Sequence, residues 1–231
     1  RQRRDANRDA FDDFRRLVVR RRCAGNTMPH IVVVSGSNRA EAQSHRIGEI
    51  ITSRLPQAGA EWGTTAEHLS LRDNPVPMWE EAKRDADNAL WAERWKPVSE
   101  KLKAADGVVV ITPEWHGMAS PMIKNFLCCC DAGELAFKPG YMVAVSAGAG
   151  GAYPIAELRM SGAKNNYLHW LPDHLIVRKA NDFEPGANNE AAPDWLVARM
   201  DHGLKILSAY AEAAKPLRTG VVDLGILRNG M

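Results

Sequence analysis

Residues 31–46, IVVVSGSNRAEAQSHR, decide the fold of this chain. The stretch opens with an unbroken β-branched run, which is typical of a strand that is covered on both faces. Gly36 and Ser37 end that run, and a short polar loop leads directly into an isoleucine-rich helical pattern over residues 47–55. A strand, a tight polar turn and a helix in immediate succession predict the first half of a parallel β-α-β unit.

Further apolar runs of strand length follow along the chain. They lie at 108–111, 142–145 and 175–177, with a weaker run at 67–71, and helical patterns separate them. Ser120-Pro121 is a plausible cap and first turn for one of these helices, and Pro193-Asp194 opens the last one. The order predicts an α/β fold: a flavodoxin-like, doubly wound sheet of five parallel strands in the order 2-1-3-4-5, with helices on both faces.

Charge is spread unevenly over the 231 residues. The formal net charge is +2, but residues 1–27 carry an excess of +5, so the remainder is mildly acidic and gives no case for a nucleic-acid partner. We expect residues 1–27 to be a basic N-terminal extension outside the fold, although a basic arm that contacts a partner is the alternative. Residues 28–215 are then expected to form one flavodoxin-like domain, and 216–231 a C-terminal tail.

Cysteine usage points to a reducing compartment. Cys128, Cys129 and Cys130 are consecutive, and adjacent helical side chains point about 100° apart, so they cannot form a normal disulfide or a metal site on their own. We expect small buried apolar side chains in a cytoplasmic protein. The apolar cluster at 17–19 is too short for a membrane span, and His169 and His174 lack paired ligand spacing, so we expect neither membrane contact nor a metal.

The loop after the first predicted strand has the chemistry of a phosphate site. Ser37, Arg39, Gln43 and Ser44 bring hydroxyl, guanidinium and amide groups to the positive end of a helix. A phosphate dianion favours one fixed cation together with several N–H and O–H donors. The alternative is an ordinary strand-to-helix turn in which Ser44 serves as the N-cap.

Two more loops are expected at the same edge of the sheet, where ligands bind in open α/β folds. Residues 112–120, TPEWHGMAS, follow the third strand, and residues 146–151, SAGAGG, follow the fourth. Both are rich in small or hydroxyl residues at a sharp turn. The G-x-G-x-x-G fingerprint of a dinucleotide-binding domain does not follow the first strand.

Three segments, GSNRAEAQS, PEWHGMASPMIKNFL and VSAGAGGAYPIAELR, resemble the NAD(P)H-dependent FMN reductase family over about residues 29–177. These are flavodoxin-like oxidoreductases that include azo and quinone reductases. The resemblance implies a tightly bound FMN, NAD(P)H as a transient co-substrate, and a homodimer or homotetramer. It places the FMN phosphate on Ser37, Arg39, Gln43 and Ser44. The flavin ring would lie along Pro113, Glu114, Trp115, His116, Gly117 and Met118, with Ser146 and Gly148 bordering its dimethylbenzene side or the partner's flavin.

The chain departs from the family pattern at one dipeptide. Family members often carry Tyr-Asn where this chain has Trp115-His116. Trp115 can still stack on the ring, and His116 is expected to be a contact residue, because hydride chemistry at flavin N5 needs no acid–base catalyst. No catalytic side chain is therefore expected. For Ser146 and Gly148, close helix packing after a glycine turn is the alternative.

These observations predict an FMN-dependent oxidoreductase. It would take a hydride from NAD(P)H onto bound FMN and pass electrons to a flavin, quinone or azo acceptor by a ping-pong mechanism. The alternative is a flavodoxin-type electron carrier that serves protein partners. Arg39 and the near-neutral charge argue against it, since flavodoxins are strongly acidic and bind phosphate without arginine. A cofactor-free scaffold or sensor is a third class, which predicts a colourless protein.

Overall fold

The computed structural model describes residues 28–84 and 87–227. The expectation for the N-terminal extension therefore lies outside the described residues. Within them, no helix combines the length and the apolar character needed to cross a bilayer.

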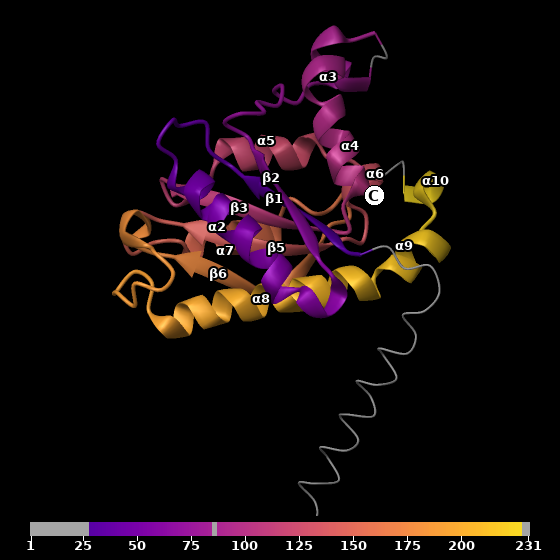
Figure 1. Ribbon diagram of the computed structural model, residues 1–231. Helices are drawn as coiled ribbons and strands as arrows, with labels where there is room; N and C mark the ends of the chain where they lie inside the picture. Colours follow the sequence, from indigo (N-terminus) through magenta and orange to yellow (C-terminus); the bar gives the residue numbers. More distant parts are fainter. Residues whose placement is uncertain (1–27, 85–86, 228–231) are drawn as a thin grey trace, which may run out of the picture.

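Five parallel strands form a central sheet in the order β2-β1-β3-β5-β6 (Figure 1). Counted along the chain without the short β4, this is the predicted order 2-1-3-4-5. The strand order reverses between β1 and β3, which is where open α/β sheets bind ligands. The strands are β1 (His30–Ser35), β2 (Thr65–Ser70), β3 (Gly107–Trp115), β5 (Pro139–Val145) and β6 (His169–Val177).

A sixth strand, β4 (Met118–Ala119), was not predicted. It folds back on the end of β3 as an antiparallel hairpin, with Glu114 opposite Ala119 and Trp115 opposite Met118. Two residues are too few to produce a hydrophobic pattern, so the sequence carries no strand signal there.

Helices cover both faces of the sheet (Figure 1). The side chains of β1 alternate between the two layers: Ile31 and Val33 face one core, and Val32 and Val34 face the other, all fully buried. The first core is closed by α2 (Gln43–Ala58) and α8 (Asp194–Ala213). The second is closed by α3 (Ala89–Arg94), α4 (Lys96–Ala104), α5 (Pro121–Cys129) and α7 (Ala152–Met160).

The helical segment before β3 is divided into two consecutive helices, α3 and α4. Trp91 lies in α3 and Leu102 in α4, and both are buried. The first helix ends at its C-cap residue, Trp95, because Pro97 occupies the first turn of α4. A proline has no N–H to donate to the preceding turn, so it starts a new helix.

The remaining elements are short. They are η2 (Ala60–Trp62), η3 (Glu81–Arg84), α6 (Ala132–Leu135), η4 (Ala180–Asp182), α9 (Lys215–Gly220) and α10 (Leu224–Leu227). The last two lie mostly in the predicted tail, yet α9 is fixed to the body: Arg218 Nη2 donates to Asp106 Oδ1 at 2.6 Å, and Lys215 Nζ lies 3.6 Å from Asp106 Oδ2. The domain boundaries at 28 and 215 stay predictions.

Candidate functional site

Three loops meet beyond the carboxyl ends of β1, β3 and β5. The first, residues 36–42, is called the phosphate loop below. It packs tightly against β3 and the start of α5: Gly36 N donates to Ile111 O of β3 at 2.9 Å, and Ser120 Oγ, at the N-cap of α5, donates to Gly36 O at 2.6 Å. A Cβ at Gly36 would lie 2.0 Å from Ile123 Cγ1, so only glycine allows this close approach.

The N-terminus of α2 is left without a cap. Ala42 is the N-cap residue, no side chain caps the helix, and its first turn holds no acid. Ser44 lies inside the helix and is therefore not the N-cap. Its side chain is only 1 % exposed, and its hydroxyl has no hydrogen-bond partner among the described protein groups. Free N–H groups and an unpartnered hydroxyl at a helix N-terminus suit an anion.

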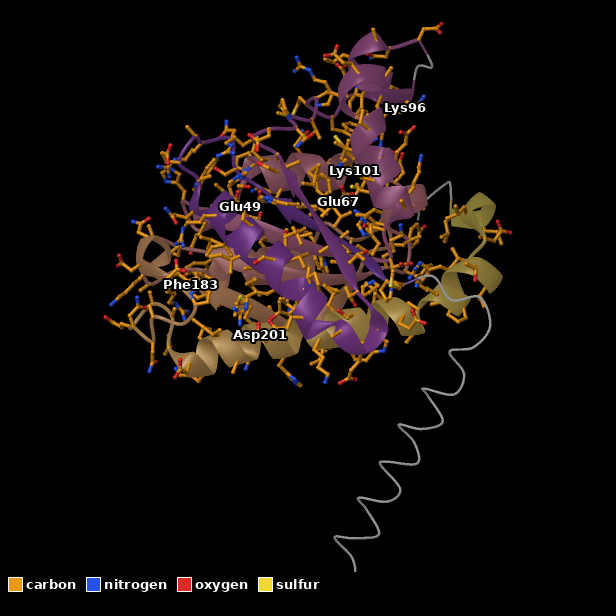
Figure 2. The ribbon with its side chains drawn as sticks, viewed as in Figure 1. Glu49, Glu67, Lys96, Lys101, Phe183 and Asp201 are labelled. Atoms are coloured by element: carbon orange, nitrogen blue, oxygen red, sulfur yellow. The ribbon has the colours of Figure 1, made fainter. Side chains whose placement is uncertain are left out.

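The other predicted phosphate residues differ in their availability. Arg39 is exposed at the middle of the loop, and its backbone N–H donates to Ser37 Oγ at 3.2 Å. Gln43 Oε1 instead accepts from Arg46 Nε at 2.9 Å, while Arg46 also donates to the carbonyls of Phe183 (2.7 Å) and Ala180. Arg46 thereby ties α2 to the loop after β6, where Phe183 is labelled in Figure 2. The oxygen of Gln43 is engaged in this link, which leaves its amide nitrogen as a donor.

The predicted flavin-ring residues form the β3–β4 hairpin. Its two turn residues, His116 and Gly117, have φ of 52° and 73°, the pattern of a type I′ turn that matches the twist of the strands. Histidine, like asparagine, is enriched among non-glycine residues at positive φ, so His116 suits a turn position where the resembled family often has asparagine. Trp115 is half-buried, and the turn residues and Met118 are exposed.

Glu114 connects the hairpin to the third loop rather than pointing into open space. Its carboxylate accepts the N–H of Gly151. A Cβ at Gly150 would lie 2.2 Å from Glu114 Oε2, and one at Gly151 would lie 2.3 Å from Ile176 Cγ2. These two glycines serve packing. Gly148 differs, because a Cβ there would meet nothing within 4 Å.

Ser146, the remaining predicted residue, lies at the base of the third loop. Its Oγ accepts from Gly148 N at 3.3 Å. Its backbone pairs with the last residue of β6 and with the segment that follows, because Ser146 N donates to Val177 O and Ala180 N donates to Ser146 O. The third loop is therefore fixed at its base. Lys179 N also donates to Gly148 O at 3.0 Å, while the space beside the Gly148 Cα is open.

Sequence reasoning missed Glu157 of α7, which holds the hairpin from behind. Its carboxylate accepts from Ala119 N at 2.7 Å and from Lys124 Nζ at 3.0 Å. Burial acts to raise the pKa of Glu157, but these two hydrogen bonds outweigh it and hold the pKa below its ordinary value. A glutamate within a helical pattern carries no signal for such a role.

The cysteine triplet lies away from these loops. Cys129 and Cys130 are buried as expected, but Cys128 is exposed, so the expectation of a buried side chain is wrong there. Burial raises the pKa of Cys129 to about 12, so that thiol is not a nucleophile at neutral pH. A cavity of about 500 Å³ lies beside Cys128, Trp79 and Lys83, and it is lined by none of the predicted site residues. No metal-binding group of three His, Cys, Asp or Glu side chains occurs among residues 28–84 and 87–227.

Comparison with known proteins identifies the family. The family model described as NADPH-dependent FMN reductase matches residues 29–182. The chain belongs to the NADPH-dependent FMN reductase family. It is accordingly an oxidoreductase enzyme with FMN as cofactor and NAD(P)H as co-substrate.

Relatives agree with this assignment. The FMN reductase chain is 26% identical over 188 residues to the NADPH azoreductase of Bacillus sp. (strain OY1-2), covering 81% of this chain and 97% of that protein. Its fold is similar to an oxidoreductase from Corynebacterium diphtheriae, with a TM-score of 0.64, 15% identity, and coverage of 80% of this chain and 98% of that one. It is also similar to FerB, the NAD(P)H:acceptor oxidoreductase of Paracoccus denitrificans, with a TM-score of 0.60, 18% identity, and coverage of 81% and 98%. At such identities the solved structures show the fold alone.

The carboxyl edge fits the cofactor of an FMN reductase. An uncapped helix N-terminus, the unpartnered Ser44 hydroxyl and the exposed Arg39 together match a phosphate group. The open Gly148 and the exposed His116-Gly117 turn leave backbone accessible at the same edge, where a flavin ring needs a close approach.

Proposed function

We propose that this FMN reductase passes electrons from NAD(P)H to a small flavin, quinone or azo acceptor by a ping-pong mechanism, with its FMN held by the three loops. The observation that carries the proposal is the α2 N-terminus: among the described residues no side chain caps it, and none is a hydrogen-bond partner for the buried hydroxyl of Ser44. The exposed Arg39 lies in the loop that leads into it.

The phosphate would be held by Ser37, Arg39, Ser44, the amide nitrogen of Gln43 and the first N–H groups of α2. A guanidinium fixes the charge, while hydroxyl and N–H donors fix the orientation of the phosphate. The FMN supplies two-electron chemistry when bound, so the protein need only bind, orient and shield it.

The flavin ring would be oriented by residues 113–118. Ser146 and Gly148 would border its dimethylbenzene side or the flavin of the partner subunit. The type I′ turn fixes the backbone of His116 and Gly117, and Trp115 offers an indole face for stacking. Glu114 holds this hairpin to the third loop through Gly151 N, so the two walls keep their spacing. The sequence has no G-x-G-x-x-G motif for a separate dinucleotide site after β1, which favours alternate binding of NAD(P)H and the electron acceptor at one site beside the flavin.

Self-association, as a homodimer or homotetramer, is part of the proposal. The large apolar side chains of Met118, Tyr153 and Met160 are 42%, 71% and 85% exposed on β4 and α7, and a subunit interface over these two elements would cover them. Sedimentation velocity of the full chain at micromolar concentration tests this, and a monomer would refute it. The proposed location is the cytoplasm, on the argument from the adjacent free cysteines.

Anaerobic spectroscopy with one pair of variants tests the function. We expect a yellow protein whose visible flavin absorbance is bleached within the mixing time by NADPH or NADH; flavin that neither nucleotide bleaches would favour the electron-carrier alternative. Arg39→Ala should weaken FMN binding by about 1.5–3 kcal/mol, because it removes a charge-assisted hydrogen bond. Arg94→Ala, an exposed arginine on α3, is the matched control. Unchanged FMN affinity in Arg39→Ala would mean that the phosphate binds elsewhere.

A further inference from the structure

Arg72 lies in the turn that follows β2, and its guanidinium reaches the phosphate loop. Nη1 donates to Ala40 O at 2.9 Å. Nε and Nη2 donate to the two carboxylate oxygens of the neighbouring Asp73 at 2.8 and 3.0 Å. The carboxylate holds the guanidinium plane in place and balances its charge, while the remaining donors point across to other elements.

The same guanidinium reaches the first turn of α2. Arg72 Nη2 lies 3.0 Å from His45 Nε2, and His45 Nδ1 lies 3.0 Å from Ser70 Oγ. A guanidinium only donates, so His45 Nε2 must accept, and the ring then carries its proton on Nδ1 and donates to Ser70. Arg72 therefore joins three elements: the phosphate loop, the start of α2 and the end of β2.

The phosphate loop has little else to hold it. Its ends are fixed, since Gly36 N donates to Ile111 O and Ala42 O accepts N–H groups of α2. Residues 38–41 between these ends are exposed. Among residues 28–84 and 87–227, the bond from Arg72 to Ala40 is the one hydrogen bond that joins residues 38–41 to another element.

We propose that Arg72 is a positioning residue for the phosphate end of FMN. It holds the loop that presents Arg39 in one conformation before the cofactor arrives, so that binding does not have to order the loop. Because Asp73 balances its charge, Arg72 acts through the geometry of the loop and not as a second cation for the phosphate. This inference rests on the proposed function, because it assumes that FMN binds at the phosphate loop.

Flavin titrations of the apoprotein test the inference. FMN and riboflavin are each titrated by flavin fluorescence into the wild type, Arg72→Ala, Arg72→Lys and Arg54→Ala. Arg54 is the matched control: its side chain is 30% exposed, as is that of Arg72, and it makes a paired contact with a carboxylate, Asp201. Asp201 belongs to α8 and is labelled in Figure 2 well apart from Glu49, which lies next to the first turn of α2.

We expect both Arg72 variants to bind FMN about tenfold more weakly, with riboflavin affinity unchanged and Arg54→Ala equal to wild type. Lysine keeps the charge but cannot span Ala40, Asp73 and His45 together. Three results would overturn the inference: FMN affinity within twofold of wild type in Arg72→Ala, full recovery in Arg72→Lys, or an equal loss for riboflavin.

Limited trypsin digestion separates this inference from the proposed function. The bond between Arg39 and Ala40 is a trypsin site in an exposed loop. Without any cofactor, Arg72→Ala should be cleaved there severalfold faster than wild type or Arg54→Ala, with the product identified by mass. Equal cleavage rates would overturn the inference even if FMN binds. Faster cleavage in a protein that does not bind FMN would refute the proposed function while leaving the contact between Arg72 and the loop established.

Discussion

Replacing Ser44 by alanine should stabilise the apoprotein and weaken the holoprotein. The hydroxyl is buried without a partner among the described protein groups, and a buried unsatisfied polar group costs about 1–3 kcal/mol. Alanine also has a higher helix propensity than serine, by about 0.5 kcal/mol. Together these terms lead us to expect that Ser44→Ala raises the free energy of unfolding of the apoprotein by about 1.5–3.5 kcal/mol.

The effect on the cofactor has the opposite sign. If the hydroxyl donates to the phosphate, its removal costs about 1.5–3 kcal/mol, or about 10- to 150-fold in the FMN dissociation constant. Urea unfolding of the apoprotein measures the first quantity, and quenching of flavin fluorescence measures the second. Opposed signs in the two measurements are what a site built to bind an anion predicts.

Ser208→Ala is the matched control for this experiment. Ser208 is also a fully buried serine inside a helix, but its Oγ donates to Leu204 O at 2.9 Å. Its replacement should leave FMN affinity unchanged and bring no gain in stability. If Ser44→Ala behaves like Ser208→Ala in both measurements, the reasoning about the α2 N-terminus is wrong.

Three further outcomes are expected. Gly36→Ala should lower the free energy of unfolding by about 1–3 kcal/mol, because its Cβ would lie 2.0 Å from Ile123 Cγ1. Ile123→Ala removes that clash, so a double-mutant cycle measured by urea unfolding should show a favourable coupling between the two substitutions, and strictly additive losses of stability would contradict this. Burial lowers the pKa of Lys138 to about 8, so between pH 8 and about 10.4 the unfolded chain binds one more proton than the folded protein. As the pH rises through that window, the free energy of unfolding of the wild type should increase by up to about 3 kcal/mol relative to that of Lys138→Met. Parallel pH profiles of the free energy of unfolding for the two proteins would refute this. Removing residues 1–27 should leave flavin content and turnover intact, and loss of either would show that the extension is needed.

Local signals account for what the sequence predicted correctly. Ser120 is the N-cap of α5, with its Oγ accepting from Ile123 N at 3.3 Å, and that pairing spans three residues. The strands likewise follow from continuous apolar runs, and the α2 and α8 helices follow from periodic apolar positions, and both patterns are local in the sequence.

The contacts that shape the site are of another kind. Glu114 to Gly151, Glu157 to Ala119 and Arg72 to Ala40 join residues 32 to 38 positions apart in the sequence. No periodicity or spacing within a segment encodes such a pairing, because it exists only once the strands have set their loops side by side. A glutamate or arginine there looks the same as a solvated surface charge.

The ends of the described chain and the three loops lie at opposite edges of the sheet, which has a practical consequence. His30 N donates to Asp106 Oδ2 at 3.0 Å, and Asp106 also receives Arg218, so the start of β1 and the last helices meet at the amino edge (Figure 1). Both ends of the described chain therefore lie away from the three loops at the carboxyl edge. An enzyme held through the amino edge of the sheet, on a resin or an electrode, would present the proposed FMN site to the solution.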